Sequence, residues 1–233
     1  MLSIVIPAYN EAIRLGPTLA RIQAWRSTLA YSSSLLVVDD GSQDATAAVA
    51  QASGAEIWRL PQNYGKGRAV REGLLRVKGD FCLITDADLS TPIEECDRLW
   101  AALAGGAALA IGSRSLPGSK VERHQPWYRE SMGRHFNRIV QGGILPGYID
   151  TQCGFKLFKA AAISEIIPRL SIDGFAFDVE MLLIARRRQL PVVQVPVRWR
   201  DDPDSRVGIV RDSTQMLWEL ARIAWQDQCG AYR

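Results

Sequence analysis

The chain has 233 residues, of which 47% are hydrophobic and 23% charged, and its formal net charge is +3. These proportions are typical of a globular protein and exclude a disordered or fibrous chain. The small net charge gives no reason to expect a nucleic-acid partner. The four cysteines form no CxxC pair and only two histidines are present, so a structural zinc site is not expected. Scattered thiols favour a reducing compartment.

The first residues predict a buried strand rather than a targeting signal. They carry no basic segment, and the apolar run Ser3–Ile6 ends at Pro7. Nowhere does an apolar run approach the roughly 18 residues that a membrane span requires. We therefore expect a cytoplasmic protein without a membrane-spanning segment.

Apolar runs alternate with amphipathic segments over the first 114 residues. We predict strands over Ser3–Ile6, Leu35–Val38, Glu56–Leu60, Phe81–Thr85 and Leu109–Ile111. We predict helices from Pro17 to Leu29, over Ala45–Ser53 and Lys66–Lys78, and from a capping box at Thr91 to Leu103. This alternation predicts an α/β fold with a mostly parallel sheet flanked by helices.

After Arg114 the pattern changes. Residues 115–148 are basic and aromatic, and they are followed by a helix near Phe177–Arg188, a strand over Val192–Val197 and a last helix from about Ile209 to Trp225. We interpret residues 1–233 as one catalytic domain with a C-terminal elaboration.

The polar residues of the first half gather where predicted strands end. In parallel sheets, ligands bind beyond the carboxyl ends of the strands. This rule selects the loops Pro7–Glu11, Asp39–Asp44, Asp86–Ser90 and Gly112–Arg114.

Asp86 and Asp88 follow a predicted strand directly. Side chains at positions i and i+2 of an extended segment point the same way, so the two carboxylates are expected to lie together. A pair of carboxylates suits Mg²⁺ or Mn²⁺ shared with a substrate diphosphate. The alternative is a surface turn without a ligand.

Two other motifs exclude competing nucleotide-binding classes. Asn63–Gly67 fails the phosphate-loop template, because Leu60 stands where a glycine is needed and Gly67 replaces the Ser or Thr. No GxGxxG follows the first strand, which removes the main support for a dinucleotide site. Pro7–Glu11 is not the Gly-rich, Arg-containing loop expected of a nucleotidyltransferase.

Taken together, Pro7–Glu11, Val37–Ser42, Asn63–Gly67 and Asp86–Asp88 resemble the inverting family 2 glycosyltransferases of GT-A fold in both order and spacing. Gly112–Arg114, Asp150–Phe158 and Phe175–Glu180 resemble a narrower branch, the polyprenyl-phosphate hexose synthases. Within it, Asp150–Phe158 is most similar to the dolichyl-phosphate β-glucosyltransferases. The resemblance implies a nucleotide-sugar half over about residues 1–114 and an acceptor-side half over about 115–233.

The resemblance also implies roles for individual residues. Donor-binding residues would be Pro7, Tyr9, Glu11, Asp40, Lys66, Asp86, Ala87 and Asp88, with the metal on Asp86 and Asp88. Acceptor-binding residues would be Arg114, Gln152, Lys156 and Arg206, and catalytic residues Asp88, Arg114, Asp178 and Arg206. The metal and the arginines would neutralise the departing diphosphate.

The implied reaction is inverting transfer of a hexose to a polyprenyl phosphate, with glucose from UDP-glucose as the first choice. A phosphate acceptor is already ionised, whereas a hydroxyl acceptor needs a base, for which Asp178 or Glu180 is the candidate. Asp178 could instead cap a helix or pair with a cation. GDP-mannose as donor, a soluble sugar or lipid hydroxyl as acceptor, and a non-catalytic nucleotide-sugar sensor stay open.

A lipid acceptor implies peripheral attachment to the cytoplasmic face of a membrane. Two segments could provide it. One is Trp127–Tyr148 with Arg129, Arg134 and Arg138, and the other is the last helix with Met216, Leu220, Ile223 and Trp225. Trp127–Tyr148 also suits a mobile lid over a lipid phosphate, for which the alternative is a surface helix pair. For the last helix the alternative is a helix packed on the domain.

Overall fold

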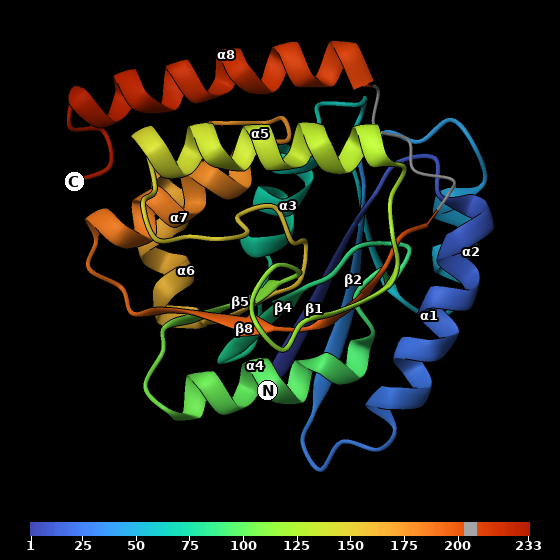
Figure 1. Cartoon of the computed structure of the whole chain (residues 1–233). Helices are drawn as coiled ribbons and strands as arrows, with labels where there is room; N and C mark the ends of the chain where they lie inside the picture. Colours follow the sequence, from blue (N-terminus) through green and yellow to red (C-terminus); the bar gives the residue numbers. More distant parts are fainter. Residues whose placement is uncertain (203–208) are drawn as a thin grey trace.

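The computed structural model describes residues 1–202 and 209–233, with side chains for 1–202 and 214–233. Its centre is a seven-stranded sheet of order β3-β2-β1-β4-β7-β5-β8 (Figure 1). The strands are β1 (Leu2–Ala8), β2 (Ser33–Asp39), β3 (Glu56–Arg59), β4 (Phe81–Ile84), β5 (Leu109–Ser113), β7 (Lys156–Lys159) and β8 (Val192–Pro196). Strand β7 runs antiparallel to β4 and β5, whereas the other described pairs are parallel. Strands β6 (Lys120–Arg123) and β9 (Arg198–Arg200) form a separate two-stranded parallel sheet.

Helices cover both faces of the large sheet (Figure 1). One face carries α1 (Ala12–Arg26), α2 (Thr46–Ala52) and α4 (Cys96–Ala104), the last preceded by the 3₁₀ turn η1 (Ile93–Glu95). The other face carries α3 (Lys66–Leu74), α6 (Ala160–Ile166) and α7 (Phe177–Arg187), with the 3₁₀ turn η2 (Ile167–Arg169). Helices α5 (Trp127–Gly143) and α8 (Ile209–Gln228) lie along the outer side of this second layer. The predicted α/β fold with a mostly parallel sheet is confirmed.

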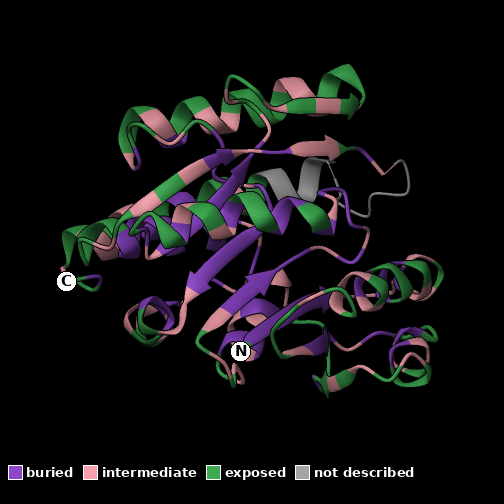
Figure 2. Ribbon diagram, turned by 90° about the horizontal axis from the view of Figure 1, so that it is seen from below, coloured by how far each residue is buried: buried purple, intermediate pink, exposed green. Residues whose placement is uncertain are grey.

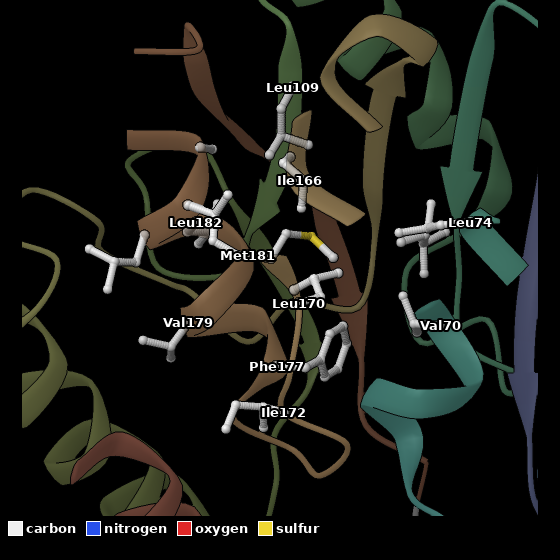
Figure 3. Close-up of a cluster of buried hydrophobic side chains, with 14 of the residues drawn as sticks. Val70, Leu74, Leu109, Ile166, Leu170, Ile172, Phe177, Val179, Met181 and Leu182 are labelled. Atoms are coloured by element: carbon white, nitrogen blue, oxygen red, sulfur yellow. The ribbon is translucent and has the colours of Figure 1, made fainter. Parts of the chain in front are cut away.

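Alternation along the strands divides the core into two clusters. On β1, Ile4 and Ile6 belong to the cluster under α1, α2 and α4, whereas Val5 belongs to the cluster under α3 and α7. Figure 3 shows part of the second cluster, to which α3 contributes Val70 and α7 contributes Phe177. The central strands β1, β2, β4, β5 and β7 are mostly buried, whereas the edge strands and the outer helix α5 are mostly intermediate or exposed (Figure 2). This rigid centre fixes where the strand-end loops lie.

Helix α1 begins at Ala12, five residues before the predicted start at Pro17, which lies inside the helix. Residues at the start of α2 supply hydrogen-bond acceptors for the additional first turn of α1. Thr46 Oγ1 accepts from the N–H of Glu11 at 2.7 Å, and Asp44 Oδ2 accepts from that of Ala12 at 3.2 Å. These partners lie more than 30 residues away, so the local sequence pattern did not predict them. The predicted capping box at Thr91 is also wrong, because the segment opens as the 3₁₀ turn η1 without a side-chain cap.

The antiparallel direction of β7 is the main feature of the sheet that the alternation of strands and helices did not predict. In register, Lys156 pairs with Ile84 of β4 and Ile111 of β5. The first residue of β7 therefore lies at the edge where β1, β4 and β5 end. The loop Asp150–Phe155, which enters β7, joins the polar loops of the N-terminal half at this edge.

Helix α8 carries two apolar stripes. Leu220 and Ile223 are buried in the core cluster, which bears out the alternative of a helix packed on the domain, and these two residues do not face a membrane. The outward stripe instead contains Trp218 and Trp225, whose side chains are 65% and 64% exposed. Within the described part of the chain, no helix combines the length and apolar character needed to cross a membrane.

Candidate active site

Asp86 and Asp88, the aspartate pair, lie in a tight turn directly after β4. Leu89 has a positive φ of 48°, and its N–H donates to the Asp86 carbonyl. Ala87 between them is buried in the core, and its carbonyl accepts from Thr18 Oγ1 at 2.7 Å. The carboxylates themselves stay partly open, with side-chain exposures of 31% and 21%. The aspartates remain accessible while Ala87 anchors the turn, but the segment is a turn and not the extended strand end that the i, i+2 prediction assumed.

Each member of the aspartate pair faces a cation. Lys66 Nζ donates to Asp86 Oδ1 at 2.6 Å, and Arg14 Nη1 lies 3.9 Å from Asp88 Oδ2. Burial alone would raise the pKa of Asp86, but the Lys66 ammonium lowers it below its ordinary value. Burial and then the charge of Asp86 raise the pKa of Asp88, which hydrogen bonding from Ser90 and then the charge of Arg14 only partly offset. Asp88 is therefore the less compensated carboxylate.

The aspartate pair fits a divalent cation with open coordination positions. Carboxylate oxygens are the ligands that Mg²⁺ and Mn²⁺ prefer. Among the described residues, no group of three or more His, Cys, Asp or Glu side chains could hold a metal. The described protein groups thus offer at most two carboxylates, which leaves positions for phosphate oxygens.

Gly154 is required for this arrangement. A Cβ on Gly154 would stand 2.1 Å from Asp86 Oδ2, closer than any real contact. The loop that enters β7 therefore passes directly against the aspartate pair, and a side chain at this position would displace the Asp86 carboxylate.

Arg114 follows β5 and is held by Asp150. Arg114 donates from its backbone N–H and Nε to Asp150 Oδ2, at 2.9 and 2.7 Å, and from Nη2 to Oδ1 at 2.8 Å. The pKa of Asp150, which burial would raise, is lowered below its ordinary value by this guanidinium. The guanidinium also lies 5.4 Å from the ring centre of Trp199. Asp150 was not predicted as a site residue, but it holds Arg114, which was.

Lys156 and Asp178 form a buried ion pair beneath the site. Lys156 Nζ donates to Asp178 Oδ1 at 2.6 Å and to the carbonyls of Cys153 and Thr151 at 2.6 and 3.3 Å. All three ammonium protons are thereby used, and the side chain is 1% exposed. Burial raises the pKa of Asp178, although Lys156 opposes the shift. The structure thus places both residues under the Asp150–Phe155 loop.

Glu180, the other candidate base, is enclosed completely. Its carboxylate accepts hydrogen bonds from the N–H groups of Ser171 and Ile172 and from the hydroxyls of Ser171 and Tyr232, at 2.7 to 3.0 Å. It has no exposed surface. In this arrangement Glu180 has no access to an acceptor, and it acts as a structural anchor.

The nucleotide-side residues lie at the ends of β1 and β2. Pro7 is buried within β1, and Tyr9 follows that strand half-buried. Asp40 is buried and accepts from the N–H groups of Tyr64 and Gly65 and from Asn63 Nδ2, at 2.8 to 3.0 Å. Asp40 therefore fixes the Asn63–Gly65 loop.

Arg14 is a residue that motif reasoning missed. Its Nε and Nη2 donate to Glu11 at 2.7 and 2.6 Å. The i, i+3 spacing on a helix was the available signal. Of the remaining predicted residues, Gln152 donates its N–H to Asp150 Oδ1 at 3.2 Å, and Arg206 lies outside the described residues.

A mostly parallel sheet with an aspartate pair beyond β4, and with Arg114 close enough for its charge to act on Asp86, is typical of the GT-A glycosyltransferases. The chain belongs to this class through one family: the family model for Glycosyl transferase family 2 matches residues 3–167. The protein is therefore a glycosyltransferase of family 2.

Relatives cover the whole chain. A dolichyl-phosphate beta-glucosyltransferase of Dictyostelium discoideum is 32% identical over 249 residues, which span 100% of this chain and 76% of the relative. The enzymes of the same name from Homo sapiens and Saccharomyces cerevisiae are 32% and 31% identical, over 100% of this chain and 77% and 76% of theirs.

Solved structures share the fold. Glucosyl-3-phosphoglycerate synthase from Mycobacterium tuberculosis, in complex with UDP, has a TM-score of 0.74 at 20% identity over 96% of this chain and 80% of its own. Mannosyl-3-phosphoglycerate synthase from Rubrobacter xylanophilus has a TM-score of 0.76 at 20% identity, over 99% of this chain and 75% of its own. Another structure of the mycobacterial enzyme, at 19% identity, contains Mn²⁺ and UDP-glucose.

Proposed function

We propose that the protein transfers glucose, with inversion, from UDP-glucose to a polyprenyl phosphate such as dolichyl phosphate. The observation that carries the proposal is the aspartate pair together with Arg114, a cation that Asp150 holds in place and whose charge acts on Asp86. A metal-binding carboxylate pair next to a fixed guanidinium suits a substrate diphosphate and an acceptor phosphate together. The shared name of the full-length relatives supports glucose and a dolichyl-phosphate acceptor.

On the donor side, residues 1–114 would hold the nucleotide sugar. Pro7, Tyr9 and Glu11 would line the base and ribose, and Asp40 would act through the loop that it fixes. Lys66, Asp86, Ala87 and Asp88 would form the diphosphate end, with Mg²⁺ or Mn²⁺ on the two aspartates. When bound, the metal supplies positive charge that stabilises the leaving diphosphate.

On the acceptor side, residues 115–233 together with Arg114 would hold the lipid phosphate, with Gln152 and Arg206 beside it. Lys156 would act from below, through the loop that carries Asp150. An ionised phosphate oxygen forms the bond to the anomeric carbon while the bond to UDP breaks, and no proton has to be removed. The pairing of Asp178 with Lys156 supports this phosphate acceptor over a hydroxyl that would need Asp178 as a base.

Product analysis tests the reaction directly. Purified protein with UDP-glucose, Mn²⁺ and a polyprenyl phosphate should yield a lipid-linked glucosyl phosphate, and NMR should show a β linkage from the α-linked donor. GDP-mannose, and a soluble acceptor such as 3-phosphoglycerate, are the comparison substrates. Faster transfer with either comparison substrate, or an α-linked product, would contradict the proposal.

We also propose that the protein attaches peripherally to the cytoplasmic face of a membrane, because its acceptor is a lipid. Trp218 and Trp225 on α8 and Trp127 on α5 present exposed indoles, the last one 80% exposed. Indole rings favour the membrane interface, and the nearby α5 arginines favour anionic lipid.

Liposome co-sedimentation tests this attachment. A Trp218→Ser/Trp225→Ser variant should bind vesicles of anionic lipid and polyprenyl phosphate several-fold more weakly than wild type. Trp58→Ser, which removes an exposed indole on β3, is the matched control and should bind normally. Equal binding by all three proteins would contradict the assignment of α8 as the attachment surface.

A further inference from the structure

The aspartate pair is already compensated by cations that belong to the chain. Lys66 Nζ lies 2.6 Å from Asp86 Oδ1, within a direct hydrogen bond. Arg14 Nη1 lies 3.9 Å from Asp88 Oδ2. A divalent ion that enters between these carboxylates therefore comes close to two fixed positive charges.

The other nearby cations have carboxylate partners of their own. Arg114 is bound to Asp150 through Nε at 2.7 Å, and Lys156 is bound to Asp178 at 2.6 Å. These pairs act on the aspartate pair only from a distance. Within the described side chains, Lys66 and Arg14 are thus the cations that bear directly on it.

Arg14 is not fully committed to one partner. Its Nε and Nη2 bind Glu11, whereas Nη1 is buried without a hydrogen-bond partner among the described residues. That nitrogen lies between Asp88 and Asp202, 3.9 and 3.5 Å from their carboxylates. Arg14 therefore shares its positive charge between Asp88 and Asp202, whereas Asp86 has a direct hydrogen bond from Lys66. Of the two aspartates, Asp88 is the less compensated.

We propose that Lys66 and Arg14 are resident counter-cations of the aspartate pair and make divalent-metal binding depend on the nucleotide diphosphate. A free metal ion meets their positive charge, whereas a metal that binds together with a diphosphate brings negative charge to offset it. Metal and nucleotide then strengthen each other's binding, and this coupling is reciprocal. The inference rests on the proposed function, from which it takes the metal and the UDP moiety.

Mn²⁺ titration of the full chain, with free Mn²⁺ followed by electron paramagnetic resonance, measures the coupling. Wild type should bind Mn²⁺ at least about tenfold more tightly with saturating UDP than without it. Lys66→Met should bind Mn²⁺ alone about tenfold more tightly than wild type, the effect of one unit charge about 6 Å from a divalent ion in a water-like dielectric. The further increase in Mn²⁺ affinity that UDP gives this variant should be smaller than in wild type by a similar factor. Arg14→Met should likewise raise the Mn²⁺ affinity without UDP and reduce the increase that UDP gives.

Conservative variants separate charge from packing. Lys66→Arg and Arg14→Lys keep the positive charge and should couple metal to UDP as wild type does. Lys78→Met removes an exposed lysine that pairs with Glu56, and it controls for the loss of any lysine. Thermal melts establish that each variant is folded, and if Lys66→Met is not, Arg14→Met provides the comparison.

Two results would overturn the inference: equal Mn²⁺ affinity in wild type with and without UDP, or unchanged or weaker Mn²⁺ binding in the folded Met variants. Failure of the proposed function would be different. In that case wild type would bind no UDP at any Mn²⁺ concentration, whereas failure of this inference alone would leave UDP binding intact.

Discussion

Replacing Lys156 with methionine should separate the structural role of the buried ion pair from a role in ligand contact. Methionine keeps the unbranched, buried side chain but leaves the Asp178 carboxylate without its cation, and it removes the donor from the Thr151 and Cys153 carbonyls. Breaking a buried pair by removing one partner costs about 3–5 kcal/mol. For a domain of this size that corresponds to a fall in Tm of about 6–20 °C.

The loss should depend on pH, because burial raises the pKa of Asp178 above its ordinary value of 3.8, and removing Lys156 raises it further. The folded variant then binds a proton more readily than the unfolded chain. Its stability therefore rises as pH falls through the raised native pKa toward 3.8, and the deficit shrinks. Thermal melts at a series of pH values between about 4 and 7 measure this trend.

A second substitution tests the cause. Lys156→Met/Asp178→Leu removes both charges, and it should recover most of the lost Tm, since an apolar pair of similar volume can replace a buried ion pair. Turnover should stay low, because the loop that positions Asp150 and Arg114 remains unanchored. Lys78→Met, at an exposed pair, should cost less than about 1 kcal/mol. A single variant that melts within about 2 °C of wild type at pH 7, or whose deficit does not change with pH, would refute the reasoning.

Three further outcomes are expected. Gly154→Ala should reduce turnover about 100-fold with little change in Tm, because its Cβ displaces the Asp86 carboxylate, whereas Gly133→Ala on α5, in open space, should be silent. Tyr232→Phe should lower the free energy of unfolding by about 1–3 kcal/mol in denaturant titration, because Glu180 loses a buried donor. EDTA should abolish turnover and Mn²⁺ should restore it; full activity in EDTA would exclude the metal.

Periodicity predicted the parts of the fold that depend on neighbouring residues. The central strands followed from their apolar runs, and the shared edge followed from the rule that ligands bind beyond the carboxyl ends of parallel strands. Helix α8 was predicted as amphipathic, but it has two apolar stripes, and the sequence does not say which one faces the core. The structure buries Leu220 and exposes Trp218.

The site was predicted less completely, because charge partners are set by tertiary contacts. Lys156 was predicted to touch the acceptor, yet the reversal of β7 places its ammonium under the loop, a direction that the local pattern does not encode. Asp40 likewise uses its carboxylate to hold a loop 23 to 25 residues away. Arg14 belongs to no motif of the sequence, and only the fold brings it to Asp88.

The contacts of α8 and the residues after it determine when this protein can fold during synthesis. Leu220, Ile223 and Tyr232 fill the core cluster that α6 and α7 begin, and Tyr232 supplies one of the donors to Glu180. A nascent chain that has only reached α7 therefore has an open apolar surface and an incompletely bonded carboxylate. Such a surface is prone to aggregation. Completion of the fold has to wait until residue 232 leaves the ribosome, and until then the chain exposes this apolar surface.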